Sequence, residues 1–397
     1  RRLGEIARSD DPPFISASAS EGDLFDSIGS ASVSASFNPG EWKRALETIE
    51  QEQRRIVQYG VTEAELQREI TGIRTSLENS VAAAATRRTP QLAAGLVGSV
   101  NSGTVFNTPQ TSLELFNAAV EGLTAEQVNA VLPQVFAGEG PLALFVSPVE
   151  VEGGEDAVTA ALEASRQTPV AAPATHAELE WPYVSFGTPG AVQERREIAE
   201  VGATVVTFAN GVRLTVKPTD FRDQQILVRV RTGIGELGLP TDRSDPQSLA
   251  PLVFTQGGVG KLTADEMSRV LNGRIYSAGF GVDSDSYSLS GSTRPEDLAL
   301  EMQVLTAYLT DPGLRAAPFQ QIKAFFPQIV AQPAGRADAL RMTESLPAPS
   351  APVHIDHATA RVREVEKGEA IPDRFLDAKG EVTALADLER DLIAFAL

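Results

Sequence analysis

The sequence offers one cluster of side chains that could bind a metal ion, His354-Ile355-Asp356-His357. On a helix, two imidazoles three residues apart could share a metal, with Asp356 or a distant carboxylate completing its ligand shell. The cluster follows a proline-rich stretch, however, and matches neither H-x-x-E-H nor H-E-x-x-H. We therefore interpret it as a solvated loop and keep His354 and His357 as metal candidates, with a cryptic metal-dependent hydrolase site as the alternative. The third histidine, His176, is expected at the surface.

Two further motifs have structural explanations. The glycine loop Gln256–Lys261 lacks the G-x-x-x-x-G-K-[ST] spacing of a phosphate-binding loop and follows a predicted helix, so it predicts a helix end and a tight turn. Asp283, Asp285 and Glu296 lie near a predicted hairpin and are interpreted as solvated acids rather than a calcium site. The sequence has no G-x-S-x-G elbow and no cysteine, and its three histidines support no Ser-His-Asp arrangement. No catalytic residue is predicted.

The net charge narrows the classes of partner. The chain has 397 residues, a formal net charge of −19 and a pI near 4.7. Such a surface repels phosphate backbones, which excludes nucleic acid as a partner and favours neutral or basic ones, cationic peptides among them. The alternative interpretation is that the acidic surface charge only keeps the protein soluble. No apolar run approaches the roughly 18–20 residues that span a bilayer, so we expect no membrane span.

The first part of the chain predicts strands followed by helices. Residues 15–20 and 30–37 alternate in β-like fashion, and Asn38-Pro39 predicts the start of a helix that ends at Gly60. The sequence T-x-x-E/Q recurs and is typical of a capping box, in which the Thr oxygen and the acidic or amide side chain bind free N–H groups. Residues 81–100 and 111–120 predict helices, and residues 141–147, PLALFVS, a short buried strand. The three capping boxes begin at Thr62, Thr124 and Thr263.

Residues 149–198 are rich in proline and contain one helix-like stretch at 157–165, which indicates an extended connection between domains. Trp181 and Tyr183 are expected to attach it to a domain surface. An aromatic peptide-binding site is the alternative.

The second part predicts an α/β module. Asn210-Gly211 between β-branched runs predicts a two-residue type I′ hairpin. Strands at 225–232, 275–282 and 286–291 alternate with helices at 249–254, from 263, at 295–309 and at 317–330. The fold class is therefore α/β in α+β layers, with helices packed on one face of a largely antiparallel sheet. Residues 346–397 read as a proline-rich loop and a C-terminal helix at 381–397, without an assigned role.

Several passages together resemble the pitrilysin/insulysin-type zinc metallopeptidases. VVTFANGVRLTVKPTD (205–220) resembles the opening of a homology unit of that family, and RRLGEIARSDDPPFISASAS (1–20) resembles the middle of the second half of such a unit. YGVTEAELQREITGIRTSLENSV (59–81) is similar to its paired helices, and LSGSTRPEDLALEMQVLTAYLTDPGL (289–314) to a later strand and helix. The resemblance covers residues 1–330. It rests on the order in which these passages follow one another along the chain. It is greatest to the long bacterial, typically periplasmic, peptidases with two units in one chain.

The resemblance implies a domain order and a missing metal site. Active units carry the inverted motif H-x-x-E-H, with two His and a Glu that prepare hydrolytic water. The corresponding stretch, QSLAPLVFTQGGVG (247–260), has neither His nor Glu. Residues 1–148 then form the C-terminal half of a first unit, 149–198 a linker, and 199–345 the leading half of a second, degenerate unit. Zinc is expected in the complete family enzyme and not in this chain.

The expected function follows from that order. In this family two units close around an unfolded peptide, and the inactive unit forms part of the wall of the chamber that encloses it. We expect this chain to be the non-catalytic chamber portion, with the catalytic half-unit missing upstream, and to bind extended peptide by adding a strand to a sheet edge. An Arg–Tyr pair that helps such enzymes bind substrate has no clear counterpart here. The alternative is an inactive partner subunit that pairs in trans with a separate H-x-x-E-H subunit; the start at Arg1, in mid-module, favours the first reading.

Overall fold

The computed structural model describes residues 1–9, 11–24, 28–138, 142–147, 149–173, 179–239, 245–331, 353–356 and 361–364. The chain forms two compact units, Arg1–Ala324 and Phe325–Leu397, and each is described by itself. In the second unit the described residues include the antiparallel hairpin of β9 (Val353–Asp356) and β10 (Arg361–Glu364). The predicted helix at 381–397 lies outside the described residues.

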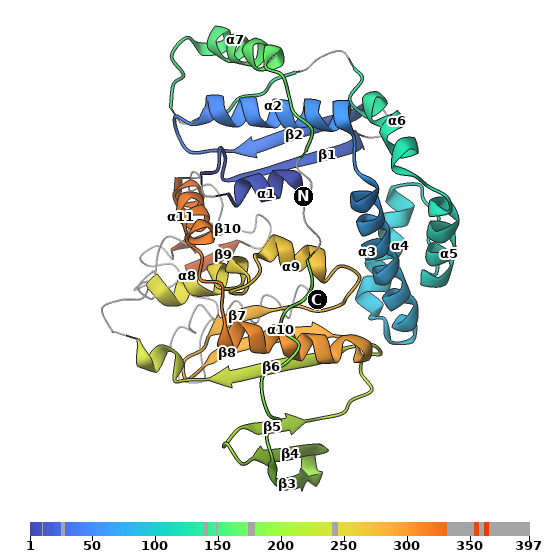
Figure 1. The fold of residues 1–397 in the computed structure, drawn as a ribbon, viewed down its shortest axis with the longest axis vertical. Coiled ribbons are helices and arrows are strands. Elements are labelled where there is room, and N and C mark those ends of the chain that lie inside the picture. Colours follow the sequence, from blue (N-terminus) through green and yellow to red (C-terminus); the bar gives the residue numbers. More distant parts are fainter. Residues whose placement is uncertain are drawn as a thin grey trace. The chain divides into compact units, whose positions relative to one another are not determined.

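The first unit begins with a short helix and a two-stranded ribbon, and Figure 1 draws the ribbon below α2 (Trp42–Tyr59) and above α1 (Arg2–Ala7). Strands β1 (Ser16–Leu24) and β2 (Ile28–Ser36) pair antiparallel, as the alternating sequence predicts. Because side chains alternate across a strand, alanines collect on one face and serines on the other. Ala17 and Ala35 pack with α1 and α2 around Phe14.

Helix α2 begins later than the sequence suggests. Asn38-Pro39 enters a turn, closed by a hydrogen bond from the Glu41 N–H to the Asn38 carbonyl at 3.0 Å, and Glu41 becomes the N-cap. Gly60 ends the helix with φ of +70°, as predicted.

A group of helices follows the ribbon. Capping boxes mark the N-termini of three helices in the first unit. Thr62, Thr124 and Thr263 each accept from the backbone N–H three residues on, while the Glu or Gln there accepts from the Thr N–H, so the boxes are confirmed. The first two open α3 (Glu63–Ala82) and α6 (Ala125–Val135). Between them lie α4 (Thr89–Asn101) and α5 (Pro109–Val120).

The predicted buried strand at 141–147 is wrong for its described residues, 142–147. They form no strand, and Leu142 and Leu144 are 95% and 92% exposed. Phe145 alone of the apolar residues there turns inward, with its ring 5.6 Å from Phe37 and 5.7 Å from Trp42. A short apolar run cannot be told from a strand until a partner strand is known.

The connecting region holds the predicted helix and two aromatic anchors. Helix α7 (Gly154–Gln167) packs on α2, and Ser165 is buried between them, donating to Glu50 at 2.5 Å. The Trp181 indole donates to Gln303, and the Tyr183 hydroxyl donates to Asp311 at 2.6 Å and accepts from the Lys261 N–H at 2.9 Å. Both anchors therefore fasten the connection, as expected, and the Tyr183 hydroxyl has no spare donor for a peptide.

Strands β3 (Val192–Ile198), β4 (Ala203–Phe208) and β5 (Arg213–Val216) form an antiparallel sheet in that order. The β4–β5 turn corrects the sequence prediction. Gly211 has φ of +85°, but Asn210 does not have positive φ, and the Phe208 N–H donates to the Val212 carbonyl. The hairpin thus has a three-residue loop with glycine in the left-handed position rather than a type I′ turn.

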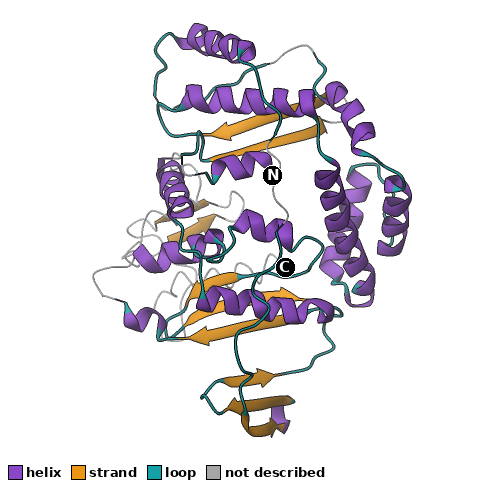
Figure 2. Ribbon diagram, in the orientation of Figure 1, coloured by secondary structure: helices purple, strands orange, loops and turns teal. Residues whose placement is uncertain are grey.

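The remaining sheet carries the larger core (Figures 1 and 2). Strands β6 (Ile226–Thr232), β8 (Tyr287–Thr293) and β7 (Gly279–Val282) lie in that order, all antiparallel. Helices α8 (Asp245–Val253), α9 (Ala264–Val270) and α10 (Leu298–Thr310) accompany them, followed by α11 (Ala316–Ala331). The core contains Val259, Leu262, Met267, Leu271, Leu289, Val304, Leu305 and Tyr308. Antiparallel sheets with packed helices confirm the predicted fold class.

Candidate functional site

Residues 247–260, which are expected to correspond to a zinc motif, lie partly in helix α8. Its sequence, DPQSLAPLV, supplies one carboxylate and no imidazole. A hydrolytic zinc needs three protein ligands and a water. The residues of α8 therefore do not fit zinc, and we derive no hydrolytic step at this helix.

The two histidine candidates do not occupy a helix. His354 lies in strand β9, where it pairs with Arg363, and His357 lies outside the described residues, as does His176. The helical spacing that would bring His354 and His357 to one metal is therefore absent at His354. No group of three or more His, Cys, Asp or Glu side chains with metal-binding geometry occurs within the described ranges.

The acidic residues near the hairpin are paired with arginines. Asp283 accepts from Arg229 at 2.7 Å and Asp285 from Arg231 at 2.6 Å. The Arg229 hydrogen bond and charge lower the pKa of Asp283. These carboxylates already have cationic partners on β6, which supports the interpretation as surface acids.

The glycine loop presents carbonyl groups, not N–H groups, to its charged neighbour. The Arg315 guanidinium donates to the Gly257 carbonyl, to Val259 at 2.9 Å and to Gly260 at 3.1 Å. Gly258 has φ of +67°, and a Cβ at Gly260 would lie 2.2 Å from Asp311. A phosphate cradle requires converging N–H donors, so the predicted tight turn is the better description.

Sequence analysis missed two buried acids at the start of α10. Asp297 and Glu301 are fully buried. Although burial opposes it, donation from the Ile275 N–H, Arg294 and Arg274 lowers the pKa of Asp297. Burial raises the pKa of Glu301: one oxygen accepts from the Ser277 N–H at 3.1 Å, and Oε1 is buried without a partner. Their spacing with Val304, Leu305 and Tyr308 follows the apolar stripe of the helix, and that is the signal that could have found them.

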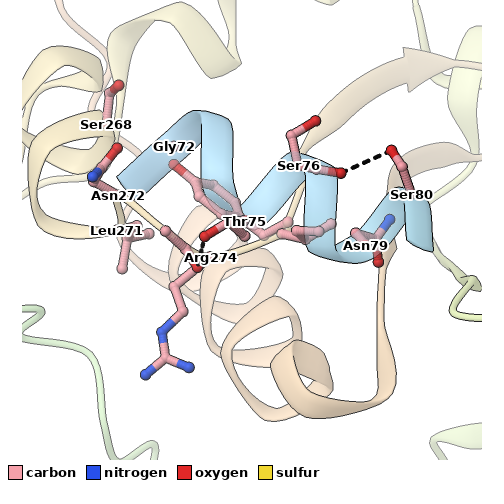
Figure 3. Close-up of a pocket in the computed structure, with 12 residues that line it drawn as sticks. Gly72, Thr75, Ser76, Asn79, Ser80, Ser268, Leu271, Asn272 and Arg274 are labelled. Carbon is pink, nitrogen blue, oxygen red and sulfur yellow. Dashed lines mark hydrogen bonds between the residues drawn. The ribbon is translucent and has the colours of Figure 1, made fainter. Parts of the chain in front are cut away.

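A polar pocket of about 470 Å³ lies between α3 and the segment 268–276 (Figure 3). Two contacts fasten its walls: Asn272 Nδ2 donates to the Arg68 carbonyl at 3.0 Å, and the Thr75 hydroxyl donates to the Gly273 carbonyl at 3.4 Å. Gly273 has φ of +79°, and a Cβ there would approach Thr71 to 2.8 Å. The wall residues are Gly72, Thr75, Ser76, Asn79, Ser80, Ser268, Leu271, Asn272, Gly273, Arg274, Ile275 and Tyr276.

The β1–β2 ribbon is the second candidate surface. In the described part of the chain neither strand pairs with a third, so both outer edges carry unpaired backbone groups. Serines 16, 18, 20, 32, 34 and 36 are exposed on the face away from the helices. The hydroxyls of Ser18 and Ser34 lie 3.1 Å apart, and those of Ser20 and Ser32 lie 2.9 Å apart. Small side chains leave the backbone edges accessible.

In the described part of the chain, every helix is too short or too polar to cross a lipid bilayer. Neither a protein-family model nor a curated protein matches the sequence.

Two solved structures are similar to the chain. One is the ferredoxin protease FusC in complex with Arabidopsis ferredoxin, at 17% identity and a TM-score of 0.47, covering 86% of this chain and 39% of that one. The other is the periplasmic protease PqqL from Escherichia coli, at 17% identity and a TM-score of 0.37, covering 86% of this chain and 37% of that one. The chain thus spans about two fifths of each of these proteins.

Proposed function

We propose that the chain is the non-catalytic, peptide-holding portion of a pitrilysin-type zinc peptidase of the bacterial periplasm. The order of the family-like passages along residues 1–330 supports this assignment, and so does the absence of His and Glu from residues 247–260. Catalysis then belongs to a half-unit that carries H-x-x-E-H, in cis or in trans. This chain supplies chamber wall and binds peptide without cleaving it.

The open edges of the β1–β2 ribbon are the observation that carries the proposal. An exposed edge of nine-residue strands is a template for another strand, and proteins usually protect such edges with lysine, proline or a covering element. Here the strands contain no lysine or proline, and serine and alanine side chains are too short to shield the backbone. An extended peptide that pairs with this edge gains main-chain hydrogen bonds regardless of its sequence. That suits a chamber that accepts varied substrates.

The charge of the chain favours a cationic peptide. A net charge of −19 steers cations toward the surface, and salt screens this attraction over about 10 Å at 0.1 M. We expect affinity for a basic extended peptide to fall as the salt concentration rises, while the main-chain pairing persists.

The test is fluorescence anisotropy with a labelled, unstructured basic peptide of twelve residues. One control peptide carries N-methyl groups on every second residue, and the other carries them on every residue, since in an added strand every second N–H faces the partner. The half-methylated peptide keeps one free edge and should bind, whereas the fully methylated peptide should not. Equal binding by these two control peptides would exclude strand addition. A parallel assay with a quenched peptide, with and without zinc, should show no cleavage; chelator-sensitive cleavage would overturn the non-catalytic assignment.

A further inference from the structure

We propose that residues 142–147 supply side-chain specificity to the peptide-binding function above, on which this inference rests. The segment pairs with an extended peptide and places Leu142, Leu144 and Val146 beside apolar side chains at every second position of that peptide. The ribbon edge binds main chain regardless of sequence, so this segment is where one peptide is distinguished from another. Its occupant is an extended peptide with alternating apolar residues and a basic end.

The backbone of this segment is free to pair with another strand. Residues 142–147 belong to no helix or strand, and within the described part of the chain the backbone groups of residues 142–146 have no hydrogen-bond partner. From Leu144 to Ser147 exposed and half-buried side chains alternate, which is the pattern of a strand that packs by one face. A segment with this alternation and unpaired main-chain groups is a template for an added strand.

Three apolar side chains of the segment lie in solvent. Leu142 is 95% exposed, Leu144 92% and Val146 78%, and the two leucines are the most exposed large apolar residues in the described part of the chain. Single exposed apolar residues are ordinary on protein surfaces. Here they recur at every second position, so an extended backbone presents all three on one face. A paired peptide with apolar side chains on the same face forms cross-strand apolar pairs with them.

Phe145 holds this row in position. Its half-buried ring stacks on Phe37 with 5.6 Å between the ring centroids and meets Trp42 edge-on at 5.7 Å. At the end of the segment, Ser147 Oγ accepts from the Val149 N–H at 3.1 Å and donates to the Val149 carbonyl at 2.8 Å. These contacts fix the segment before a peptide arrives, so binding has little of the chain to order.

The charge beyond the row favours a basic peptide end. Residues 142–147 carry no charged side chain, and Glu150 and Glu152, which follow them, are both exposed. A lysine at the peptide end next to Val146 lies near these carboxylates, in a chain whose net charge is −19. An acidic end at the same place is repelled.

The experiment is a double-mutant cycle measured by fluorescence anisotropy on the full chain. One labelled peptide is Lys-Leu-Thr-Leu-Thr-Val-Lys, and the other has threonine in place of both leucines and the valine, so length and charge are the same. The apolar peptide should bind at least about tenfold more tightly, which corresponds to about 1.4 kcal/mol shared among three cross-strand pairs. Leu142→Thr with Leu144→Thr should reduce this preference to about twofold, because one pair remains. The matched control is Leu227→Thr with Leu237→Thr, at leucines 73% and 79% exposed, and it should leave the preference unchanged.

Disulfide trapping locates the bound peptide, because the chain has no cysteine. Leu144→Cys supplies a single thiol. The apolar peptide with cysteine in place of its central leucine should form a mixed disulfide with that thiol in a glutathione redox buffer. Leu227→Cys, on β6, is the control and should react more slowly, since no bound peptide raises the local concentration there.

Equal affinity of the apolar and threonine peptides for the unaltered chain would overturn the inference without relying on any variant. A preference that survives Leu142→Thr with Leu144→Thr, or equal trapping at the two thiols, would also overturn it. A disulfide-linked dimer that forms faster from Leu144→Cys than from Leu227→Cys, without peptide, would assign the segment to a second copy of the chain instead.

The methylated peptides report on the proposed function separately. If the half-methylated and fully methylated forms bind alike, strand addition fails altogether. If they differ while the apolar and threonine peptides bind alike, only the role of residues 142–147 fails.

Discussion

The β1–β2 ribbon and the β6–β8–β7 sheet divide the tasks of the first unit between them. Around the ribbon, the buried core is small and contains Ala7, Phe14 and Ala45. Around the second sheet, ten buried residues form one cluster, including Val304 and Leu305. The ribbon has two open edges and an exposed serine face, whereas α10 covers β8 and α8 contacts β7. The larger core and the exposed serine face therefore belong to different sheets.

Removing aliphatic groups should show the largest contrast. Leu305→Ala leaves a cavity in the larger core and should lower the free energy of unfolding by about 2–5 kcal/mol. Val33→Ala, at a half-buried position of the ribbon, should cost less than about 1.5 kcal/mol. Urea denaturation followed by circular dichroism measures both. Similar losses would mean that the ribbon contributes as much to stability as the second sheet.

The two regions should also respond to pH with opposite sign. In the second, burial raises the pKa of Glu301, so the folded state keeps a proton that the unfolded chain releases above about pH 4.3. Stability should therefore decline as the pH rises through and beyond that value. Glu301→Gln keeps an acceptor for the Ser277 N–H and should remove the decline.

Glu65 in α3 is bound by Arg2 of α1, the helix that packs on the ribbon. Although burial opposes it, the Arg2 ion pair and the Thr62 hydrogen bonds lower the pKa of Glu65 to about 2. The unfolded chain then binds the proton first, and this contribution to stability should be lost as the pH falls from about 4.5 to about 2. Glu65→Gln should reduce the loss of stability between about pH 4.5 and about pH 2. The same variant should leave unchanged the decline of stability that we attribute to Glu301. Urea midpoints measured from pH 3 to pH 8 on both variants test the two signs. A decline of stability above about pH 4.3 that survives Glu301→Gln contradicts the first.

Helix caps should give a smaller contrast. Thr263 caps α9 against the larger core and is partly buried, whereas Thr124 caps the exposed start of α6. Thr263→Ala should cost about 1–2 kcal/mol of global stability, while Thr124→Ala should cost about 0.5–1 kcal/mol. Hydrogen exchange separates the two: the first change should raise exchange in the core, the second only in α6. Global exchange after Thr124→Ala would show that α6 unfolds together with the core.

The smallest effect is expected on the serine face. Ser18→Ala with Ser34→Ala removes a solvent-exposed hydroxyl pair and should change stability by less than about 0.5 kcal/mol. Because we assign peptide binding to the main chain of the edge, the anisotropy affinity should stay within about twofold. A tenfold loss would instead assign recognition to the hydroxyl groups.

Local signals in the sequence predicted much of the fold. Three capping boxes, the stop at Gly60 and the anchoring of Tyr183 are confirmed because each depends on neighbours in the sequence or on one amphipathic side chain. The strand at 141–147 and the type I′ turn were wrong because an apolar run needs a partner strand, and Asn-Gly also suits a three-residue loop. The domain boundaries at 148 and 198 and the metal role of His354 and His357 remain predictions.

The sequence by itself determined where the three helices with capping boxes begin, which strand faces are small or polar, and that residues 247–260 contain neither His nor Glu, because each depends on residue type and spacing. The tertiary structure decided which acids are buried, which edges stay open and which walls enclose the pocket. Glu301 resembles any helical glutamate until Gly291, lacking a Cβ, makes room for it under β8. Asn79 lines a pocket only because residues 268–276, almost 200 positions away, lie against α3. Burial depends on the side chains that meet in space, and the spacing of residues in the sequence does not specify those meetings.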